Sequence, residues 1–379
     1  MIYNLCATCT FGLESVLRNE IWNLGFKVDN TSDGKVYFKT DNLGIAKANL
    51  YLRTADRVLL LVGEFNADSF DMLYDNTAAL EFEKFIPADG KFDIHKVSSV
   101  KSTLASKSDC QAVIKKAVAE RLKKMHSVSD LPESGADFSI YVSIKNDIVQ
   151  ILINTSGPGL NKRGYRAVGN EAPLKETLAA AMVLLSDYSA EKTLADVMCG
   201  SGTILIEAAM IMKNIAPGIN RSFACEKWND DFFECFKSAR EEAKRNVTDI
   251  TLRILGSDID YFSIKQAKEN AEKAGVGDCI SFQKLDLKDF SSKKKCGVII
   301  SNAPYGMRTG GHEVLRTYKD LGIVYRNLNE WSAFILCGHE NFEKAFGQRS
   351  AKNRKLYNGG IKTYFYSYYP KDGCGNENK

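Results

Sequence analysis

The chain has 379 residues, of which 44% are hydrophobic and 26% are charged, and its formal net charge is +4. This length exceeds that of one ordinary domain and predicts two or three, while the composition is typical of a soluble globular protein. No apolar run approaches the roughly 20 residues of a membrane span, and residues 1–12 lack the basic and apolar segments of a secretory leader. We therefore expect a cytoplasmic protein with no membrane contact, whose small positive charge permits a nucleic-acid partner without requiring one.

The cysteines do not indicate a disulfide framework or a metal site. Ten of them are scattered along the chain, which is typical of reduced thiols in a protein of this length. Cys6 and Cys9 form the only Cys-x-x-Cys pair, and the chain has four histidines. Because no second pair or histidine cluster lies near, we expect no metal.

Residues 1–60 predict a small α/β domain. A strand at 2–6, a helix at 12–24 that ends at Gly25, a strand at 36–39 and a second helix from Ile45 follow one another. This order favours a ferredoxin-like arrangement. A plain packing domain and a binding domain are equally compatible with the pattern.

Residues 61–157 predict a second α+β domain. We expect strands at 59–65 and 91–97, a helix at 69–84, a basic helix at 109–124 and a hairpin of strands 139–144 and 148–154. The segments Phe85-Ile86-Pro87, Phe92-Asp93-Ile94 and Cys110-Gln111 resemble a THUMP domain, an RNA-binding module of RNA-modifying enzymes. On charge alone, the basic helix is more often a solvated face than a phosphate-binding one. Beside a base methyltransferase, the phosphate-binding role is the favoured one.

The stretch 157–166 contains Gly157, Pro158 and Gly159 and predicts a hinge. Its Arg163, Tyr165 and Arg166 indicate either an RNA contact or an ordinary linker. A helix that begins near Pro173 follows it.

The most informative stretch is 193–212, which predicts a strand, a glycine turn and a buried helix. Gly200 and Gly202 allow a sharp turn and a close approach to a ligand, and the N–H groups that open the helix favour an anion. The dinucleotide fingerprint would need a third small residue where Leu205 stands, and the phosphate loop would need a Gly-Lys-Ser/Thr that is absent. The pattern therefore indicates a nucleotide-type site, but not one for NAD or ATP.

Three further strands end in polar residues. Strand 253–260 ends near Asp258 and Asp260, strand 280–286 ends at Asp286, and an apolar strand from 297 delivers Asn302-Ala303-Pro304-Tyr305. In an open α/β sheet, ligands bind at this carboxyl edge. A carboxylate after the second strand suits the hydroxyls of a ribose, and Asp286 suits an adenine amino group.

Taken together, residues 158–379 resemble a class I S-adenosylmethionine-dependent methyltransferase that acts on an amino group of a nucleobase. The family usually carries Asn-Pro-Pro-Tyr where this chain has residues 302–305. The resemblance implies that Asn302 and a backbone carbonyl of Ala303 or Pro304 hold the amine, while the ring of Tyr305 stacks on the base. Ala303 replaces a proline and so removes a φ restraint, and Val197 also stands where the family often has proline, but neither change removes a polar group.

The C-terminal region predicts strands at 332–337 and 361–369 that resemble the last antiparallel hairpin of such a sheet. The tyrosines of the final strand favour core packing over an RNA stacking platform. A basic run precedes it with Arg349, Lys352, Arg354 and Lys355, near the expected catalytic face. Residues 372–379 predict a polar tail.

The order of the motifs narrows the resemblance to the THUMP-containing guanine-N2 methyltransferases of large-subunit rRNA. The motifs that carry it are Gly12-Leu13-Glu14, Gly164-Tyr165-Arg166, 172–181, 196–203, Ala216-Pro217-Gly218 and 302–306 with Arg308. The resemblance implies an α/β fold with a Rossmann-like C-terminal sheet behind ferredoxin-like and THUMP domains. It also implies S-adenosylmethionine as the cofactor, S-adenosylhomocysteine as the product and RNA, most simply 23S rRNA or a large-subunit precursor, as the partner, with no DNA expected.

The resemblance also assigns residues to roles. The catalytic set is Asn302, Ala303, Pro304 and Tyr305. The cofactor set is Asp196, Cys199, Gly200, Gly202, Thr203, Asp258 and Asp286, with Asp260 as an alternative to Asp258. The expected RNA contacts are Lys101, Lys115, Lys116, Arg121, Arg163, Tyr165, Arg166 and Arg308.

Three other functions remain open at this point. Relatives with the same modules modify tRNA guanosines, and the catalytic loop does not separate the two substrates. Asn-x-Pro-Tyr also serves DNA adenine-N6 methylation, although the THUMP-like segment argues against DNA. A non-catalytic RNA-binding assembly factor would require a decayed site, whereas all the motif elements are complete.

Overall fold

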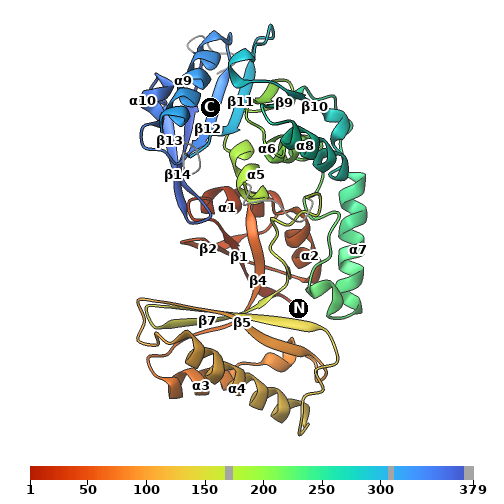
Figure 1. The fold of residues 1–379 in the computed structure, drawn as a ribbon. Coiled ribbons are helices and arrows are strands. Elements are labelled where there is room, and N and C mark those ends of the chain that lie inside the picture. Colours follow the sequence, from red (N-terminus) through yellow and green to blue (C-terminus); the bar gives the residue numbers. More distant parts are fainter. Residues whose placement is uncertain (167–173, 306–310, 371–379) are drawn as a thin grey trace.

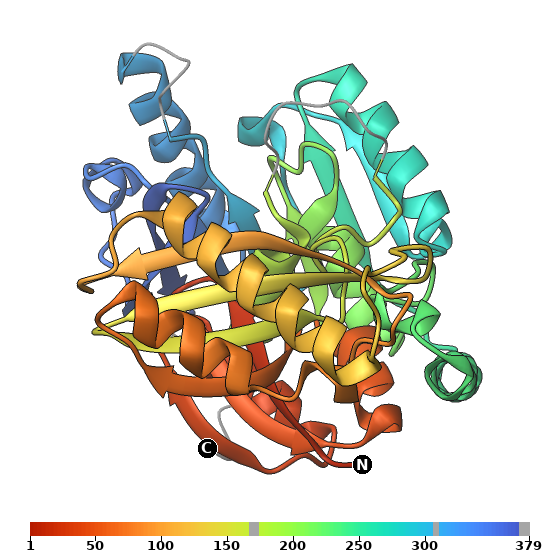
Figure 2. The same ribbon diagram turned by 90° about the horizontal axis from the view of Figure 1, so that it is seen from below.

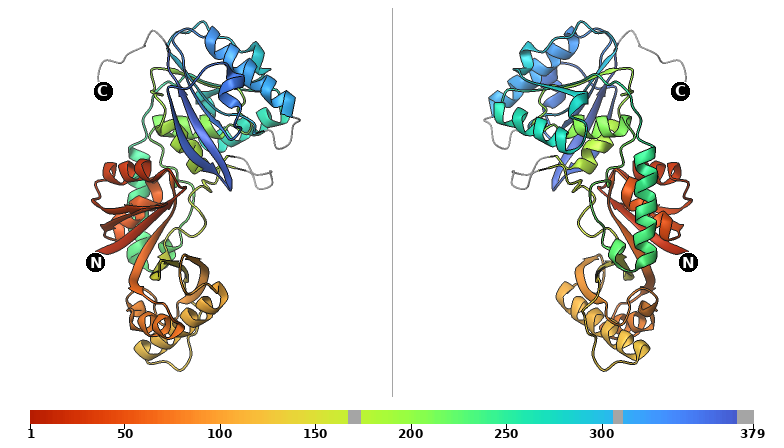
Figure 3. Two further views of the ribbon diagram at one scale, coloured as in Figure 1. Left: turned by 90° about the vertical axis from the view of Figure 1, so that its left-hand side faces the viewer. Right: turned by 90° about the vertical axis from the view of Figure 1, so that its right-hand side faces the viewer.

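The computed structural model describes residues 1–166, 174–305 and 311–370. Figures 1 and 3 show an elongated molecule in which the N-terminal domain lies between the other two. The second domain forms one end and the C-terminal domain forms the other. None of the helices within the described part of the chain has the length and apolar character needed to cross a bilayer.

The N-terminal domain has the predicted ferredoxin-like topology. Its elements are β1 (Tyr3–Cys9), α1 (Glu14–Asn23), β2 (Val28–Ser32), β3 (Lys35–Thr40), α2 (Asn42–Tyr51) and β4 (Ala55–Asn66). The strands are ordered β2-β3-β1-β4, as in a ferredoxin-like fold. Strand β2 was missed, because all its residues after Val28 are exposed and it therefore lacks apolar alternation.

The second domain continues the same sheet. Its elements are α3 (Phe70–Ala79), the 3-10 turn η1 (Phe82–Lys84), β5 (Lys91–Val100), α4 (Lys107–His126), β6 (Asp137–Lys145) and β7 (Ile148–Asn154). Strand β4 pairs with β1 and with β7, so one seven-stranded sheet in the order β2-β3-β1-β4-β7-β6-β5 spans both domains. The predicted boundary after residue 60 lies inside β4. Helices α3 and α4 lie side by side on this part of the sheet (Figure 2).

The predicted helix at 69–84 ends early. Ser69 caps α3 by accepting a hydrogen bond from the N–H of Met72, but Leu80 adopts an extended conformation and the chain re-enters only a 3-10 turn. Sequence periodicity did not reveal this break, because neither glycine nor proline marks it.

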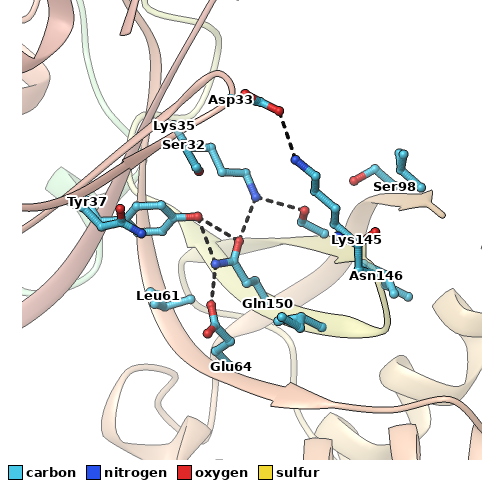
Figure 4. Close-up of a pocket in the computed structure, with 15 residues that line it drawn as sticks. Ser32, Asp33, Lys35, Tyr37, Leu61, Glu64, Ser98, Lys145, Asn146 and Gln150 are labelled. Atoms are coloured by element: carbon cyan, nitrogen blue, oxygen red, sulfur yellow. Dashed lines mark hydrogen bonds and ion pairs between the residues drawn. The ribbon is translucent and has the colours of Figure 1, made fainter. Parts of the chain in front are cut away.

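A lysine links strand β3 to strands β6 and β7 across one face of the seven-stranded sheet. Lys35 of β3 donates from Nζ to Ser143 Oγ of β6 at 2.9 Å and to Gln150 Oε1 of β7 at 2.7 Å, and Gln150 donates from Nε2 to Glu64 at 2.6 Å (Figure 4). These side chains line a cavity of about 530 Å³. Partial burial lowers the pKa of Lys35. Because these polar groups hydrogen-bond to one another, they connect the first two domains across the cavity. We call this set of hydrogen bonds the clasp.

The C-terminal domain is a Rossmann-like α/β sheet, which confirms the predicted fold class. Its strands are β8 (Thr193–Asp196), β9 (Ile254–Asp258), β10 (Ile280–Lys284), β11 (Gly297–Asn302), β12 (Ser332–Cys337), β13 (Lys352–Asn358) and β14 (Ile361–Tyr368). They are ordered β10-β9-β8-β11-β12-β14-β13, and only β14 and its pairs are antiparallel. The strand order reverses between β8 and β11, which is where an open sheet binds its ligand.

The helices of the C-terminal domain cover both faces of this sheet, with one exception. They are α5 (Glu176–Leu184), α6 (Thr203–Met212), α7 (Asp230–Arg245), α8 (Tyr261–Lys273), α9 (Gly311–Asn327) and α10 (Phe342–Phe346), with the 3-10 turns η2 (Cys225–Lys227), η3 (Gly277–Cys279) and η4 (Leu287–Asp289). Helix α7 runs along the N-terminal domain instead of the sheet (Figure 1). It contacts α2, and Lys47 forms an ion pair with Glu242 at 2.8 Å.

The linker before the C-terminal domain is fixed by a buried carboxylate. Glu207 of α6 is fully buried and accepts from Arg163 Nε at 3.3 Å and from the Tyr165 hydroxyl at 3.0 Å. Arg163 also donates to the carbonyls of Leu160 and Arg53. Arg163 and Tyr165 were expected to contact RNA, but each is only 3% exposed, so that expectation is wrong for both residues.

We expect Glu207→Gln to destabilise the protein by about 3 kcal/mol, because it leaves the buried Arg163 charge without its counter-ion. Urea denaturation measures the change. Glu234→Gln is the matched control, since Glu234 forms an exposed ion pair with Lys237 at 3.4 Å and should change stability by less than about 1 kcal/mol. Equal unfolding free energies for the two variants would contradict this role of Glu207.

Candidate active site

The glycine turn between β8 and α6 has the geometry that its sequence predicts. Gly200 and Gly202 have φ values of +50° and +79°, which residues with a Cβ rarely adopt. A Cβ on Gly202 would lie 3.0 Å from Ala267 and 3.1 Å from the ring of Phe282, whereas a Cβ on Gly200 would meet no atom within 4 Å. Gly202 therefore packs against the domain, and Gly200 borders open space at the carboxyl edge of the sheet.

Asp258 joins this turn to the end of β9. Its carboxylate accepts from the Gly200 N–H at 2.9 Å and from the Asp260 N–H at 2.9 Å. Asp260 instead caps α8 by accepting from the N–H groups of Phe262 and Ser263. Hence Asp258, rather than its alternative Asp260, is directed toward the glycine turn.

Asp286 lies just after β10, between this strand and the 3-10 turn η4. Its carboxylate accepts from the Lys288 N–H at 3.2 Å and forms an ion pair with Lys288 Nζ at 3.0 Å. These bonds stabilise the charged form and lower the pKa of Asp286. The acid is therefore ionised at neutral pH.

Asp196 lies at the end of β8 and is 2% exposed. It accepts from the Ser301 hydroxyl of β11 and from the Met198 N–H at 3.2 Å. Burial raises its pKa to about 7. Asp196 thus connects β8 and β11, the two strands between which the strand order reverses.

Cys199 and Thr203 border the same turn. Burial raises the pKa of the Cys199 thiol, so it is not a nucleophile at neutral pH. The Thr203 hydroxyl accepts from Arg166, which also pairs with Glu176 at 3.2 Å. Arg166 was expected to contact RNA, but its guanidinium is directed to α5 and α6 instead.

The loop after β11 brings the four predicted catalytic residues together. The Tyr305 hydroxyl donates to Asn302 Oδ1 at 2.7 Å and accepts from Asn358 Nδ2 at 3.2 Å. The Pro304 carbonyl accepts from the Tyr318 hydroxyl. Tyr305 thus already contacts the oxygen that was expected to hold the target amine.

The structure shows what restrains the loop at Ala303, where the family motif usually has proline. Its N–H donates to the Leu336 carbonyl of β12 at 2.9 Å, and its side chain is fully buried. A proline at this position has no N–H and could not make this bond. The chain therefore fixes the loop with a hydrogen bond where the family pattern uses a restrained φ.

Tyr318 was missed by the sequence analysis. It lies on α9, which was not predicted, and is fully buried against Phe342 with ring centroids 5.1 Å apart. Its hydroxyl also accepts from Cys337 Sγ at 3.4 Å. No local pattern near residue 318 indicates a contact with the catalytic loop, because helix and loop meet only in the folded chain.

The remaining expected RNA contacts lie in the second domain. Lys101, Lys115 and Lys116 are exposed. Arg121 forms an ion pair with Glu83, so its guanidinium is already engaged. Arg308 lies outside the described residues. Figure 1 shows α4 in the domain at one end of the molecule, and β11, which leads into the catalytic loop, in the domain at the other end.

Three protein-family models match the chain in the order of its domains. An RlmL ferredoxin-like domain matches residues 4–59, a THUMP domain matches 67–154, and an RMKL-like methyltransferase domain matches 163–366. The third match alone covers more than half of the chain.

Two relatives and one solved structure agree with these matches. "Putative RNA methyltransferase YpsC" of Bacillus subtilis (strain 168) is 45% identical over 97% of this chain and 96% of its own length. "Ribosomal RNA large subunit methyltransferase K/L" of Shewanella baltica (strain OS185) is 32% identical over 96% of this chain but only 53% of its own length. The chain thus spans about half the length of the K/L relatives.

The solved structure is that of SMU.472, a putative methyltransferase complexed with SAH, which superimposes with a TM-score of 0.93 at 40% identity over 98% of this chain and 99% of that one. The chain therefore belongs to the RMKL-like methyltransferase family, with a ferredoxin-like domain and a THUMP domain before the catalytic one, and the resemblance drawn from its motifs is confirmed.

Proposed function

We propose that this chain transfers a methyl group from S-adenosylmethionine to the exocyclic N2 amine of a guanosine in 23S rRNA. The observation that carries the proposal is the carboxyl edge of one sheet, where the glycine turn and Asp258 lie on two strand ends and Asn302 lies on a third. The names of two relatives, an RNA methyltransferase and an rRNA large-subunit methyltransferase, support the substrate class. The SAH in SMU.472 supports the cofactor.

The residues at the turn fit an adenosine-type cofactor. Beside Gly200 there is room for a ligand, and the Asp258 carboxylate lies at this point, which supports the proposal that it would hold the ribose hydroxyls. Asp196, Cys199, Gly202 and Thr203 would surround the methionine part, and Asp286 would face the adenine. The cofactor supplies an electrophilic methyl group when it is bound.

The catalytic loop supplies acceptors for the amine. An exocyclic amine is a poor nucleophile, because its lone pair is delocalised into the base. Hydrogen bonds to the Asn302 side-chain oxygen and to a backbone carbonyl would orient it and favour its pyramidal form. The Pro304 carbonyl already accepts from Tyr318, which favours the Ala303 carbonyl as the second acceptor.

Tyr305 would exchange partners when the base arrives. Its hydroxyl now donates to Asn302, and an incoming amine would replace this bond. The freed ring can then stack on the base. A paired guanosine would first have to leave its helix.

The test is transfer of labelled methyl from S-adenosylmethionine to unmodified 23S rRNA and, separately, to unmodified tRNA, followed by nucleoside digestion. We expect N2-methylguanosine in the rRNA alone. Label in tRNA alone would support guanosine-N2 methylation but identify tRNA, and not 23S rRNA, as the substrate. N6-methyladenine in DNA would contradict both the proposed reaction and the proposed substrate. Absence of transfer to every nucleic acid, with the cofactor bound, would favour a non-catalytic assembly factor.

Asn302→Ala should lower turnover by at least about 100-fold, because it removes one of the two oriented acceptors. Titration with S-adenosylhomocysteine should give a dissociation constant close to that of the wild type, since Asn302 does not contact the cofactor in this proposal. A variant that keeps most of its turnover would rule out this role for Asn302.

Tyr318→Phe should lower kcat roughly 5-fold, since one hydrogen bond to the Pro304 carbonyl is worth ~1 kcal/mol. KM for the cofactor should not change. Tyr368→Phe is the matched control, because Tyr368 is buried in the same hydrophobic core as Tyr318. The Tyr368 hydroxyl has no hydrogen-bond partner among the described residues.

Comparing the two tyrosine variants distinguishes an effect of Tyr318 on the position of the catalytic loop from an effect on the stability of the domain. Each loses one buried hydroxyl from the same core. If both lower kcat equally, Tyr318 acts through the stability of the domain and not through the catalytic loop.

A further inference from the structure

The β13–β14 hairpin overhangs the catalytic edge of the sheet. Cys337, the last residue of β12, pairs with Tyr364, so residues 358–363 extend beyond the carboxyl ends of the parallel strands. Arg354 donates to Ser15 Oγ at 2.7 Å, which joins the hairpin to the N-terminal domain (Figure 1). At the tip, Asn358 contacts the Tyr305 hydroxyl. The hairpin is therefore continuous with the proposed target-base site.

One face of this hairpin alternates lysine and tyrosine. In the strand register Lys355 faces Tyr364, and Tyr357 faces Lys362. Along each strand the lysine Nζ also lies over a ring, at 5.4 Å for Lys355 and Tyr357 and at 5.2 Å for Lys362 and Tyr364. Phe11 of the N-terminal domain is 48% exposed and meets Tyr357 edge-on at 5.9 Å. We call these five residues the hairpin platform.

The charges of the hairpin platform are not neutralised within the described part of the chain. Lys355 and Lys362 are exposed, and neither forms an ion pair with a carboxylate among the described residues. The other tyrosines of the final strand differ, because Tyr366 and Tyr368 are buried in the core. Tyr364, nearer the tip of the hairpin, is half-buried and keeps part of its ring in contact with solvent.

We propose that the hairpin platform binds the single-stranded RNA that flanks the target nucleotide. Unpaired bases can stack on Tyr357, Tyr364 and Phe11, while the interleaved lysines contact the phosphates. A duplex hides the faces of its bases and does not fit such a surface. This inference rests on the proposed function for the identity of the reaction, but RNA binding at the platform is measurable without turnover.

The test is fluorescence anisotropy of a labelled, short, single-stranded RNA oligonucleotide in the presence of S-adenosylhomocysteine. Tyr357→Ala should weaken binding about tenfold, because it removes a stacking ring. Tyr357→Phe keeps the ring and should bind like the wild type. Circular dichroism and the melting temperature check that each variant is folded.

A double variant tests the lysines. Lys355→Ala with Lys362→Ala should reduce the dependence of log affinity on log salt by about 1.4, since each phosphate contact on a single strand contributes roughly 0.7. Lys237→Ala with Lys273→Ala removes the same charge from exposed positions on α7 and α8, on the other side of the molecule in Figure 1. This control should keep the wild-type salt dependence.

The outcomes separate the two proposals. Unchanged binding in Tyr357→Ala and in the lysine pair, or a wild type that prefers an RNA duplex, overturns the platform even if 23S rRNA is methylated. Binding that weakens as expected, in a protein that methylates neither rRNA nor tRNA, supports the platform and overturns the proposed reaction.

Discussion

The buried carboxylate of Glu207 connects the C-terminal domain to the linker and, through the linker, to the N-terminal domain. It lies on the helix that opens at the glycine turn, and it accepts from Arg163 and Tyr165 of the linker. Arg163 in turn donates to the Arg53 carbonyl of the N-terminal domain. A buried charge is costly unless it is paired and hydrogen-bonded. Any other course of the linker would leave Glu207 without Arg163 and Tyr165, so these contacts favour the course that is observed. These contacts thereby fix the orientation of the first domain relative to the glycine turn.

The catalytic loop is fixed by bonds that reach it from several elements. Strand β12 accepts from Ala303, helix α9 donates to Pro304, and the hairpin tip donates to Tyr305. Acceptors that are oriented before the substrate arrives need no reorganisation during the reaction. The replacement of proline by alanine is therefore compatible with a rigid loop, since the neighbouring strand supplies the restraint.

The elongated shape gives the proposed RNA two distant regions to contact. The exposed lysines of α4 lie in the domain at one end of the molecule, and the hairpin platform lies where the C-terminal domain meets the N-terminal domain. Contacts to phosphate hold an RNA without reading its sequence, whereas stacking beside the target base sets its position. The clasp formed by Lys35 and Gln150 holds the first two domains together between these regions.

Most of the element order, the ferredoxin-like and Rossmann-like folds and the proposed catalytic segment 302–305 could be predicted from the sequence by itself. Their signals are local, because hydrophobic period, glycine turns and strand-end acids lie within short stretches. The sequence did not determine which cations are exposed. Arg163 and Glu207 are 44 residues apart, and only packing shows that they neutralise each other.

The tertiary structure alone also decided the roles of Tyr318, Ala303 and β13. The partner of Tyr318 is a backbone carbonyl 14 residues away, and the partner of Ala303 is on another strand. Strand β13 was only a basic run in the sequence, because its outward lysines hide the apolar alternation that marks a strand. Such contacts depend on elements that meet through the sheet, so no short-range pattern encodes them, whereas the chemistry of the motif residues is present in the chain before it folds.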